Sequence, residues 1–491
     1  MVLADPGASR REEMVTRLTL ASILLVAAAV RLAGLHFSLW LDESASLAFA
    51  RQPLSHLWGE WMLRETNPPL FYTLLKGWQA IVGTSDAVAR LLPIAIGLVG
   101  VWGMFLLGRA IGGARAGLLA AALLALSAIH VDYSLQLRGY GLAHGGVMFA
   151  CFAMVRFLQE RASKWLLMYV GAAAVALYGH TTLALFVALA NGAMLVILRR
   201  DRGALARWLV ANMALALLWG WWGWITVRQL GQPHNFGWIT VPSVADAWHS
   251  ASIALVPLYL RSGTIGGGGI LAVMLAGAGL FAIRRGRPET SLLAMLALGA
   301  PLLLFAVSHK TPVLLPRTLF WASGPLLALL AAGIVSMKER RTGLLVAGTL
   351  LALSGAALAA WYPDGQQEQW DSAATTLDRQ ASGRDIWVAD DAVALALAHY
   401  LPDAAARIVV VENPGAPHER WAGGLFTGRH VDADRAAMLF RDQCHVAVVT
   451  RGDYDPSALL VALRGRATPI GSRARNPLLS LWDCDVRAAA R

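Results

Sequence analysis

Two adjacent carboxylates, Asp42 and Glu43, follow the first long apolar run, in the string Leu39-Trp40-Leu41-Asp42-Glu43. Carboxylates at the edge of a membrane are costly and usually have a function. A partly desolvated carboxylate can act as a general base, so the pair is a candidate catalytic centre. The alternative is a structural role, as a topological anchor or a helix cap.

The acidic pair opens an unusually long connection, residues 36–86, which is polar, aromatic and proline-containing. Typical connections have about 4–6 residues. Its string Asn67–Tyr72 contains two adjacent prolines, which fix two φ angles and bar a regular helix before them. This element would hold the loop rigidly under a site. Apolar residues at helical spacing over 54–62 predict an amphipathic helix in the membrane interface, or a simple packing helix.

Two arginines follow short polar strings and are candidates for binding an anion. Arg138 lies in Gln136–Tyr140, and Arg317 lies seven residues after Lys310. The planar guanidinium suits phosphate, whereas the alternative is contact with lipid headgroups. His180 falls between two short apolar runs, where a lone histidine is more often structural.

The composition is that of an integral membrane protein. The chain has 491 residues, of which 57% are hydrophobic and 15% charged, with a mean hydropathy of +0.53. Soluble domains contain about 25% charged residues. Apolar runs long enough to span a bilayer recur through the first three quarters of the chain. The first run lacks a small-residue cleavage site before Asp42, so we expect no cleaved signal peptide.

The positive charge belongs to the membrane part. Residues 363–491 contain 14 basic and 17 acidic residues, and the remainder contains 28 basic and 14 acidic residues. The surplus therefore sets membrane topology, and it is not the basic face of a nucleic-acid-binding domain. We expect no nucleic-acid partner.

Basic clusters at alternate ends of the apolar runs predict about eleven transmembrane helices, because all the clusters can then be cytoplasmic. This requires that residues 165–198 form two short spans. The expected spans are 15–35, 87–108, 115–131, 139–158, 165–179, 181–198, 207–227, 268–283, 290–308, 319–336 and 342–361. The expected outer segments are 36–86, a turn around 130–132, 228–267, 309–318 and the tail from 363.

The tail predicts a soluble α/β domain. The runs 385–389, 407–411 and 445–449 have strand character and alternate with Ala/Leu-rich helical stretches. We therefore expect a membrane domain, 1–362, and an extracytoplasmic domain, 363–491, acting as a lid or docking module. A disulfide between Cys444 and Cys484 is left open.

Four elements, in order, resemble the polytopic GT-C glycosyltransferases of the protein mannosyltransferase and aminoarabinose transferase type. The first is the acidic pair Asp42-Glu43. The second is Asn67–Tyr72 followed by Arg90, which is similar to the family's Pro-Pro-Leu-Tyr-Tyr element with its downstream arginine. The third, Ser134–Tyr140, is similar to Ser-Gln-x-x-Arg-x-Tyr, and the fourth, Pro316-Arg317-Thr318, is similar to Pro-Arg-Tyr. The chain departs from the family at Asn67 (often His or Lys), Leu135 (often Gln) and Thr318 (usually Tyr).

The resemblance implies a polyprenyl-phosphate-linked sugar donor, bound from the outer leaflet, and a lipid, glycan or protein acceptor. Asp42 would deprotonate the acceptor in an inverting displacement, while Glu43 would orient the acceptor or help bind a divalent cation. The departing phosphate would be held by Arg138 and Arg317, with Lys310 assisting. The further substrate-binding candidates are Asn67, Arg90, Tyr140 and His180. No cofactor is specified beyond that cation, with Asp42 and Glu43 as candidate ligands.

Two alternative functions remain open from the sequence. A polytopic lipid or polysaccharide transporter should show inverted repeats and broken helices at mid-membrane, whereas the polar residues here gather at one face. A polymerase or ligase with the same lipid-phosphate leaving group is not distinguished by sequence. The Ala-, Arg- and Gly-rich composition points to a bacterial cytoplasmic membrane, with the active site on its outer side.

Overall fold

The computed structural model describes residues 6–231, 239–258, 267–365, 368–380, 382–412, 424–432, 434–436, 438, 445–451, 467–469 and 479–485. These residues form two compact units. The helical unit comprises the described residues within 1–35, 66–231 and 239–364, and the α/β unit comprises those within 36–65 and 365–491. The domain boundary at 363 stays a prediction; in the structure, residues 36–65 pack with the C-terminal part.

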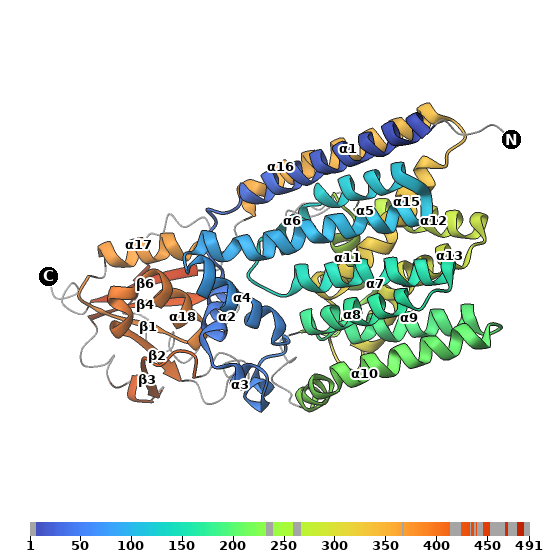
Figure 1. Ribbon diagram of the computed structural model, residues 1–491. Coiled ribbons are helices and arrows are strands. Elements are labelled where there is room, and N and C mark those ends of the chain that lie inside the picture. The colour runs from blue at the N-terminus through green and yellow to red at the C-terminus, as the bar shows by residue number, and fades with distance from the viewer. Residues whose placement is uncertain are drawn as a thin grey trace. The chain divides into compact units, whose positions relative to one another are not determined.

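The helical unit consists of long apolar helices (Figure 1). Among the described residues, eight segments are long and apolar enough to cross a membrane, and two shorter apolar helices accompany them. The predicted helical membrane fold is confirmed, whereas the count of eleven spans stays a prediction. The elements are α1 (Pro6–Leu32), α4 (Leu70–Val82), α5 (Asp86–Ala125), α6 (Ala128–Leu135), α7 (Tyr140–Glu160), α8 (Lys164–Gly179), α9 (Leu183–Leu198), α10 (Arg202–Leu230), α11 (Val244–Leu255), α12 (Gly267–Arg285), α13 (Pro288–Ser308), α14 (Pro316–Leu319), η3 (Phe320–Ala322), α15 (Ser323–Val335), α16 (Arg340–Trp361) and η4 (Tyr362–Asp364).

Two helix breaks fall where the sequence predicted them. The run 165–198 is divided into α8 and α9, with His180 in extended backbone between them (φ −158°). Helix α5 is interrupted at Gly113, between the expected spans 87–108 and 115–131. The φ of Gly113 is +80°, a conformation that glycine adopts at no steric cost.

One predicted turn was wrong. Residues 130–132 lie within α6 instead of forming a turn. The preceding helix ends early, at Ala125, because Ser127 adopts the extended backbone of a helix N-cap and starts a new helix (φ −67°, ψ 115°). The turn comes one helix later, at residues 136–139, and Arg138 lies in it.

The predicted 228–267 loop also contains a helix, α11. A reciprocal capping box starts it: Asp246 N donates to Ser243 Oγ at 3.2 Å, and Ser243 N donates to Asp246 Oδ2 at 2.9 Å.

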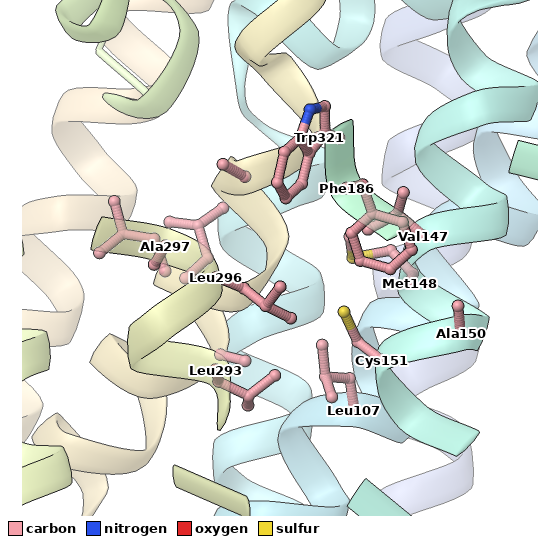
Figure 2. Packing of buried hydrophobic residues seen from close by; sticks show 14 of the residues in the cluster. Leu107, Val147, Met148, Ala150, Cys151, Phe186, Leu293, Leu296, Ala297 and Trp321 are labelled. Carbon is pink, nitrogen blue, oxygen red and sulfur yellow. The ribbon is translucent and has the colours of Figure 1, made fainter. Parts of the chain in front are cut away.

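The core of the helical unit lies where α5, α7, α9, α13 and η3 meet (Figure 2). Phe186 and Trp321 pack edge to face, with ring centroids 5.3 Å apart. Cys151 is fully buried in the same cluster and serves in its packing. Since lipid offers no hydrophobic driving force between helices, this close packing is what holds their positions.

A buried polar network joins α1, α5 and α6. Arg31 is fully buried; its Nε donates to Ser134 Oγ at 2.8 Å and its Nη2 contacts His130 Nδ1 at 2.6 Å. Arginine can only donate, so His130 Nδ1 is the acceptor. Gly97 on α5 makes room, because a methyl group there would lie 2.5 Å from Ser134 Cβ. The network ties α1 to the helix that leads into the Arg138 turn.

The α/β unit contains a six-stranded sheet of order β3-β2-β1-β4-β6-β5 (Figure 1). Strands β3, β2, β1 and β4 are parallel, while β6 is antiparallel to β4 and to β5. The elements are α2 (Leu41–Arg51), α3 (Leu54–Leu57), η1 (Glu60–Arg64), α17 (Trp370–Gln380), β1 (Asp385–Val388), α18 (Asp391–Tyr400), η5 (Pro402–Arg407), β2 (Ile408–Glu412), β3 (Arg429–Asp432), β4 (His445–Arg451), β5 (Ala467–Pro469) and β6 (Leu479–Asp485).

The three predicted strands are confirmed as β1, β2 and β4. Their register aligns Ile386 with Ile408 and with Ala447, all of which belong to one buried apolar cluster. Alternation along each strand thus places one apolar row against the helices α17 and α18. Cys444 lies outside the described residues, so the disulfide with Cys484 stays a prediction.

The single amphipathic helix expected over 54–62 is wrong. Helix α3 ends at Leu57, and a short 3-10 helix begins at Glu60. The break falls at Gly59, whose backbone is extended (φ −112°, ψ −176°). A methyl group at Gly59 would lie 2.5 Å from the carbonyl oxygen of Ser55, so glycine is required for this tight reversal.

Candidate active site

Arg138 projects from the turn between α6 and α7, and a close backbone approach fixes this turn. Gly139 lies so near the end of α8 that a methyl group there would overlap the carbonyl oxygen of Gly179. Its φ of −70° is open to any residue, so glycine is needed for space alone. Arg138 is 5% exposed, and its Nη1 donates to Tyr72 Oη at 3.2 Å. A buried guanidinium is thereby held beside the end of α8.

His180 directly follows α8, in the extended residue after Gly179. Its Nδ1 accepts a hydrogen bond from the Thr182 backbone N–H at 3.3 Å and lies 2.9 Å from Thr182 Oγ1. A backbone N–H can only donate, so the proton of the neutral ring is on Nε2. The ring can therefore donate one hydrogen bond to an anion.

The electrostatics keep His180 neutral. Burial lowers the pKa of His180 to about 3, and the positive charges of Arg317 and Arg138 add to the effect. The ring thus takes up a proton only well below pH 5. These charges act on one histidine, so Arg138, His180 and Arg317 form a group, here called the cation cluster.

Arg317 reaches this cluster from the first turn of α14. Thr318 fixes the start of that helix, because its Oγ1 accepts from Leu315 N at 2.9 Å and donates to Val313 O at 2.6 Å. The threonine that replaces the family's tyrosine therefore has a structural task in this chain. Arg317 itself is half-buried.

Tyr140 and Asn67 adjoin the same turn. The ring centroid of Tyr140 lies 5.7 Å from that of His180. Thr181 Oγ1 donates to the carbonyl oxygen of Thr66 at 2.8 Å, which brings the residue before Asn67 against the α8–α9 connection. Helix α4 then begins with Pro69 as its N-cap and carries Tyr72.

Two further predicted residues come from other parts of the helical unit. Arg90 is buried near the start of α5 (3% exposed), and Lys310 is exposed after α13. Asp132 Oδ1 accepts a hydrogen bond from Gln136 Nε2 at 3.0 Å, which stabilises the Arg138 turn.

Asp42 and Glu43 lie in the first turn of α2, in the α/β unit. Glu43 is 1% exposed, and its Oε2 accepts from Trp40 N at 3.0 Å. It therefore caps the helix that it begins, which is half of a capping box. Asp42 is half-buried, and it is the carboxylate of the pair that has access to solvent.

The described residues contain no group of three or more His, Cys, Asp and Glu side chains that could hold a metal ion. Glu43 is already committed to the helix N-terminus. A divalent cation at this pair would need further oxygen ligands from substrate or water.

The comparisons with known proteins agree with these elements. Residues 66–224 match the model of the dolichyl-phosphate-mannose-protein mannosyltransferase family, a range that includes Asn67, Arg90, Arg138 and His180. This match and the shared fold support a membrane glycosyltransferase of the GT-C type. No curated protein sequence matches it.

Solved structures of similar fold align with nearly the whole chain. ArnT from Cupriavidus metallidurans bound to undecaprenyl phosphate aligns with a TM-score of 0.62 at 14% identity, covering 95% of this chain and 97% of that one. The Archaeoglobus fulgidus oligosaccharyltransferase in complex with Zn and sulfate aligns with a TM-score of 0.55 at 12% identity, covering 91% and 71%. At this identity the likeness shows the fold.

The sequence did not point to several polar residues that the structure shows to be buried. Arg31 and His130 form the network of the helical unit. Glu368 and Tyr400 contact the segment that carries Asp42, and Arg451 binds Glu368. Arg31 gave a signal, since a charge close to the end of an apolar run is usually functional or paired. Glu368 gave none, because a single carboxylate in a soluble segment is ordinary.

Gly139→Ala should lower sugar transfer roughly 10- to 100-fold, because displacing Arg138 by about 1 Å costs up to about that much in rate. The added methyl group would overlap the Gly179 carbonyl oxygen and push the turn away from α8. Transfer assays of purified protein would measure this. The matched control is Gly171→Ala on α8, where an added methyl group meets nothing within 4 Å. Equal activity of both variants would contradict the packing argument.

Proposed function

We propose that this glycosyltransferase moves a sugar from a polyprenyl-phosphate-linked donor to a hydroxyl of a lipid, glycan or protein acceptor. The proposal places the reaction at the outer face of a bacterial cytoplasmic membrane, with the C-terminal domain also outside. It rests above all on the cation cluster, in which the charges of Arg138 and Arg317 both act on a neutral, buried His180. Two guanidinium groups and one N–H donor suit a lipid-linked phosphate.

The proposed chemistry is a single displacement with inversion. The acceptor oxygen forms a bond to the anomeric carbon, and the bond from that carbon to the phosphate oxygen breaks with its electron pair. Asp42 takes the proton of the acceptor hydroxyl. The polyprenyl phosphate leaves with the developing negative charge, which Arg138 and Arg317 stabilise because they are positioned beforehand.

The other candidates have supporting roles in the proposal. His180 and Tyr140 would contact the phosphate or the sugar, and Asn67 would do so from the rigid start of α4. Glu43 would orient the acceptor or help hold a divalent cation. The contributions of Lys310 and Arg90 rest on the family resemblance alone.

The likeness to ArnT bound to undecaprenyl phosphate supports the donor class, because that protein shares the fold over nearly its whole length. The family match supports it too, since its members use a dolichyl-phosphate sugar by name. Neither finding specifies the sugar or the acceptor.

The test is a panel of radiolabelled polyprenyl-phosphate sugars, presented to the purified protein in liposomes with extracted envelope lipids, glycans and proteins as acceptors. Covalent transfer from at least one donor is expected. Movement of the labelled donor between leaflets without any covalent product would overturn the proposal in favour of a transporter.

A further inference from the structure

Three successive backbone N–H groups lead into α2, and each donates to a side chain. Leu39 N donates to Tyr400 Oη at 2.7 Å, and Leu41 N donates to Glu368 Oε2 at 2.8 Å. The amide between them donates to Glu43. Two of the three acceptors therefore come from the C-terminal part of the chain, more than 300 residues away in sequence.

Glu368 is held firmly in this position. It is 1% exposed, and both of its oxygens are engaged. Trp370 Nε1 donates to the oxygen that also binds Leu41 N, while Arg451 Nε and Nη2 both approach the other oxygen at 2.8 Å. Burial raises the pKa of Glu368, and the Arg451 charge opposes this shift. The charge of Asp42 also acts on Glu368, so the two carboxylates are near one another.

The sheet topology explains why these groups meet. Arg451 ends β4, and Asp390 lies two residues after the end of β1, the neighbour of β4 in the sheet. Strands β2 and β3, which follow β1 in sequence, lie on one side of β1 in the sheet, and β4 lies on its other side. The strand order therefore reverses between β1 and β4, which makes this a topological switch point. In open α/β sheets, ligands bind outside the carboxyl ends of the strands at this point. Here the chain's own residues, Glu368 and the start of α2, are held there through Arg451.

We propose that the C-terminal α/β domain is a positioning device for the catalytic carboxylate. Glu368, held by Arg451, and Tyr400 are positioning residues that fix the N-terminus of α2 and therefore the location of Asp42. Leu41 reinforces the attachment, since it is 1% exposed within the apolar cluster of the domain. This assignment rests on the proposed role of Asp42 as the base.

Two double variants separate positioning from folding. In Glu368→Met with Arg451→Met, an apolar pair replaces a buried ion pair, which is often neutral for stability, but Leu41 N loses its acceptor. Glu368→Gln with Arg451→Gln can keep an amide hydrogen bond between the two side chains and an oxygen for Leu41 N. We expect kcat to fall roughly 100-fold in the methionine pair and less than about tenfold in the glutamine pair.

The Michaelis constant for the donor should stay within about threefold of wild type in both, since the proposed phosphate contacts belong to other residues. Tyr400→Phe removes the acceptor of Leu39 N and should lower kcat about fivefold, or more. The control is Arg429→Ala, which breaks the exposed ion pair with Asp385 in the same sheet and should leave kcat unchanged.

The inference would be overturned by any of three results. These are a wild-type kcat in the methionine pair, equal losses of kcat in the two double variants, and an unchanged kcat in Tyr400→Phe. These outcomes are separate from the failure of the proposed function. If wild type transfers sugar and Asp42→Asn does not, the function stands whatever these variants do. If the wild type transfers nothing, the function itself fails.

Discussion

Asp42→Asn should lower sugar transfer by about a thousandfold, because it removes the general base while keeping the size of the side chain. Of the two adjacent carboxylates, Asp42 is the half-buried one, whereas Glu43 is 1% exposed and accepts from Trp40 N. A base must reach the proton that it abstracts. The geometry of α2 therefore favours Asp42, and single-turnover assays with a reactive donor would measure the loss.

Glu43→Gln is the comparison that decides between the two carboxylates. A glutamine oxygen can still accept from the Trp40 N–H, since Glu and Gln both serve in capping boxes. We expect this variant to keep more than about a tenth of the wild-type rate, because a neutral cap costs only tenths to 2 kcal/mol of helix stability. Asp371→Asn, in the first turn of α17, is the matched control for an exposed aspartate. An active Asp42→Asn or an inactive Glu43→Gln would contradict the assignment.

The sequence was sufficient wherever local pattern decides structure. Short runs rich in β-branched residues predicted β1, β2 and β4. The structure shows why, because successive residues such as Ile386, Trp387 and Val388 are all buried, and a strand buried on both faces has such continuous apolar runs. The break at His180 followed from the charges at helix ends, because one long helix would have inverted the topology of everything after it. The Pro68-Pro69 pair likewise predicted that no regular helix precedes it, and α4 begins directly after Pro69.

The sequence failed where steric detail at single residues decides structure. Gly59 divides the expected 54–62 helix, because only glycine fits against the Ser55 carbonyl oxygen. Ser127 starts a new helix inside an uninterrupted apolar run, although its side chain makes no capping hydrogen bond. Hydrophobic periodicity carries neither kind of information.

Long-range partners were equally inaccessible. The cation cluster was predicted as separate motifs, but the contact that holds the Arg138 turn against α8 depends on Gly139 and Gly179, which no motif singled out. Likewise Leu41 and Glu368 lie 327 positions apart. A buried ion pair such as that of Glu368 with Arg451 becomes visible only once the fold has excluded water from both side chains.

Removing either arginine of the cation cluster should lower kcat/KM about 100-fold, the usual cost of losing one donor to a developing charge. The variants are Arg138→Met and Arg317→Met, which keep length and lose charge. Lysine at either position should recover part of the loss, since it supplies charge without the planar fork. Tyr72→Phe removes only the hydroxyl that accepts from Arg138 and should cost less than tenfold.

The double variant tests whether both arginines act on one phosphate. If they do, the two losses should not multiply, because groups that stabilise the same charge act as a unit. Free polyprenyl phosphate should also inhibit each variant more weakly than wild type, since it is the product that the cluster would bind. The control is Lys338→Met, an exposed cation between α15 and α16.

If the losses of kcat/KM multiply fully in the double variant, the two arginines act in different steps. If kcat/KM falls less than about fivefold in a single variant, that arginine does not belong to the site. Product inhibition gives the sharper result. A transition-state contact made only to the bridging oxygen would lower kcat and leave inhibition unchanged. A cluster that holds the phosphate before and after bond cleavage, as the buried Arg138 beside His180 suggests, would change both together.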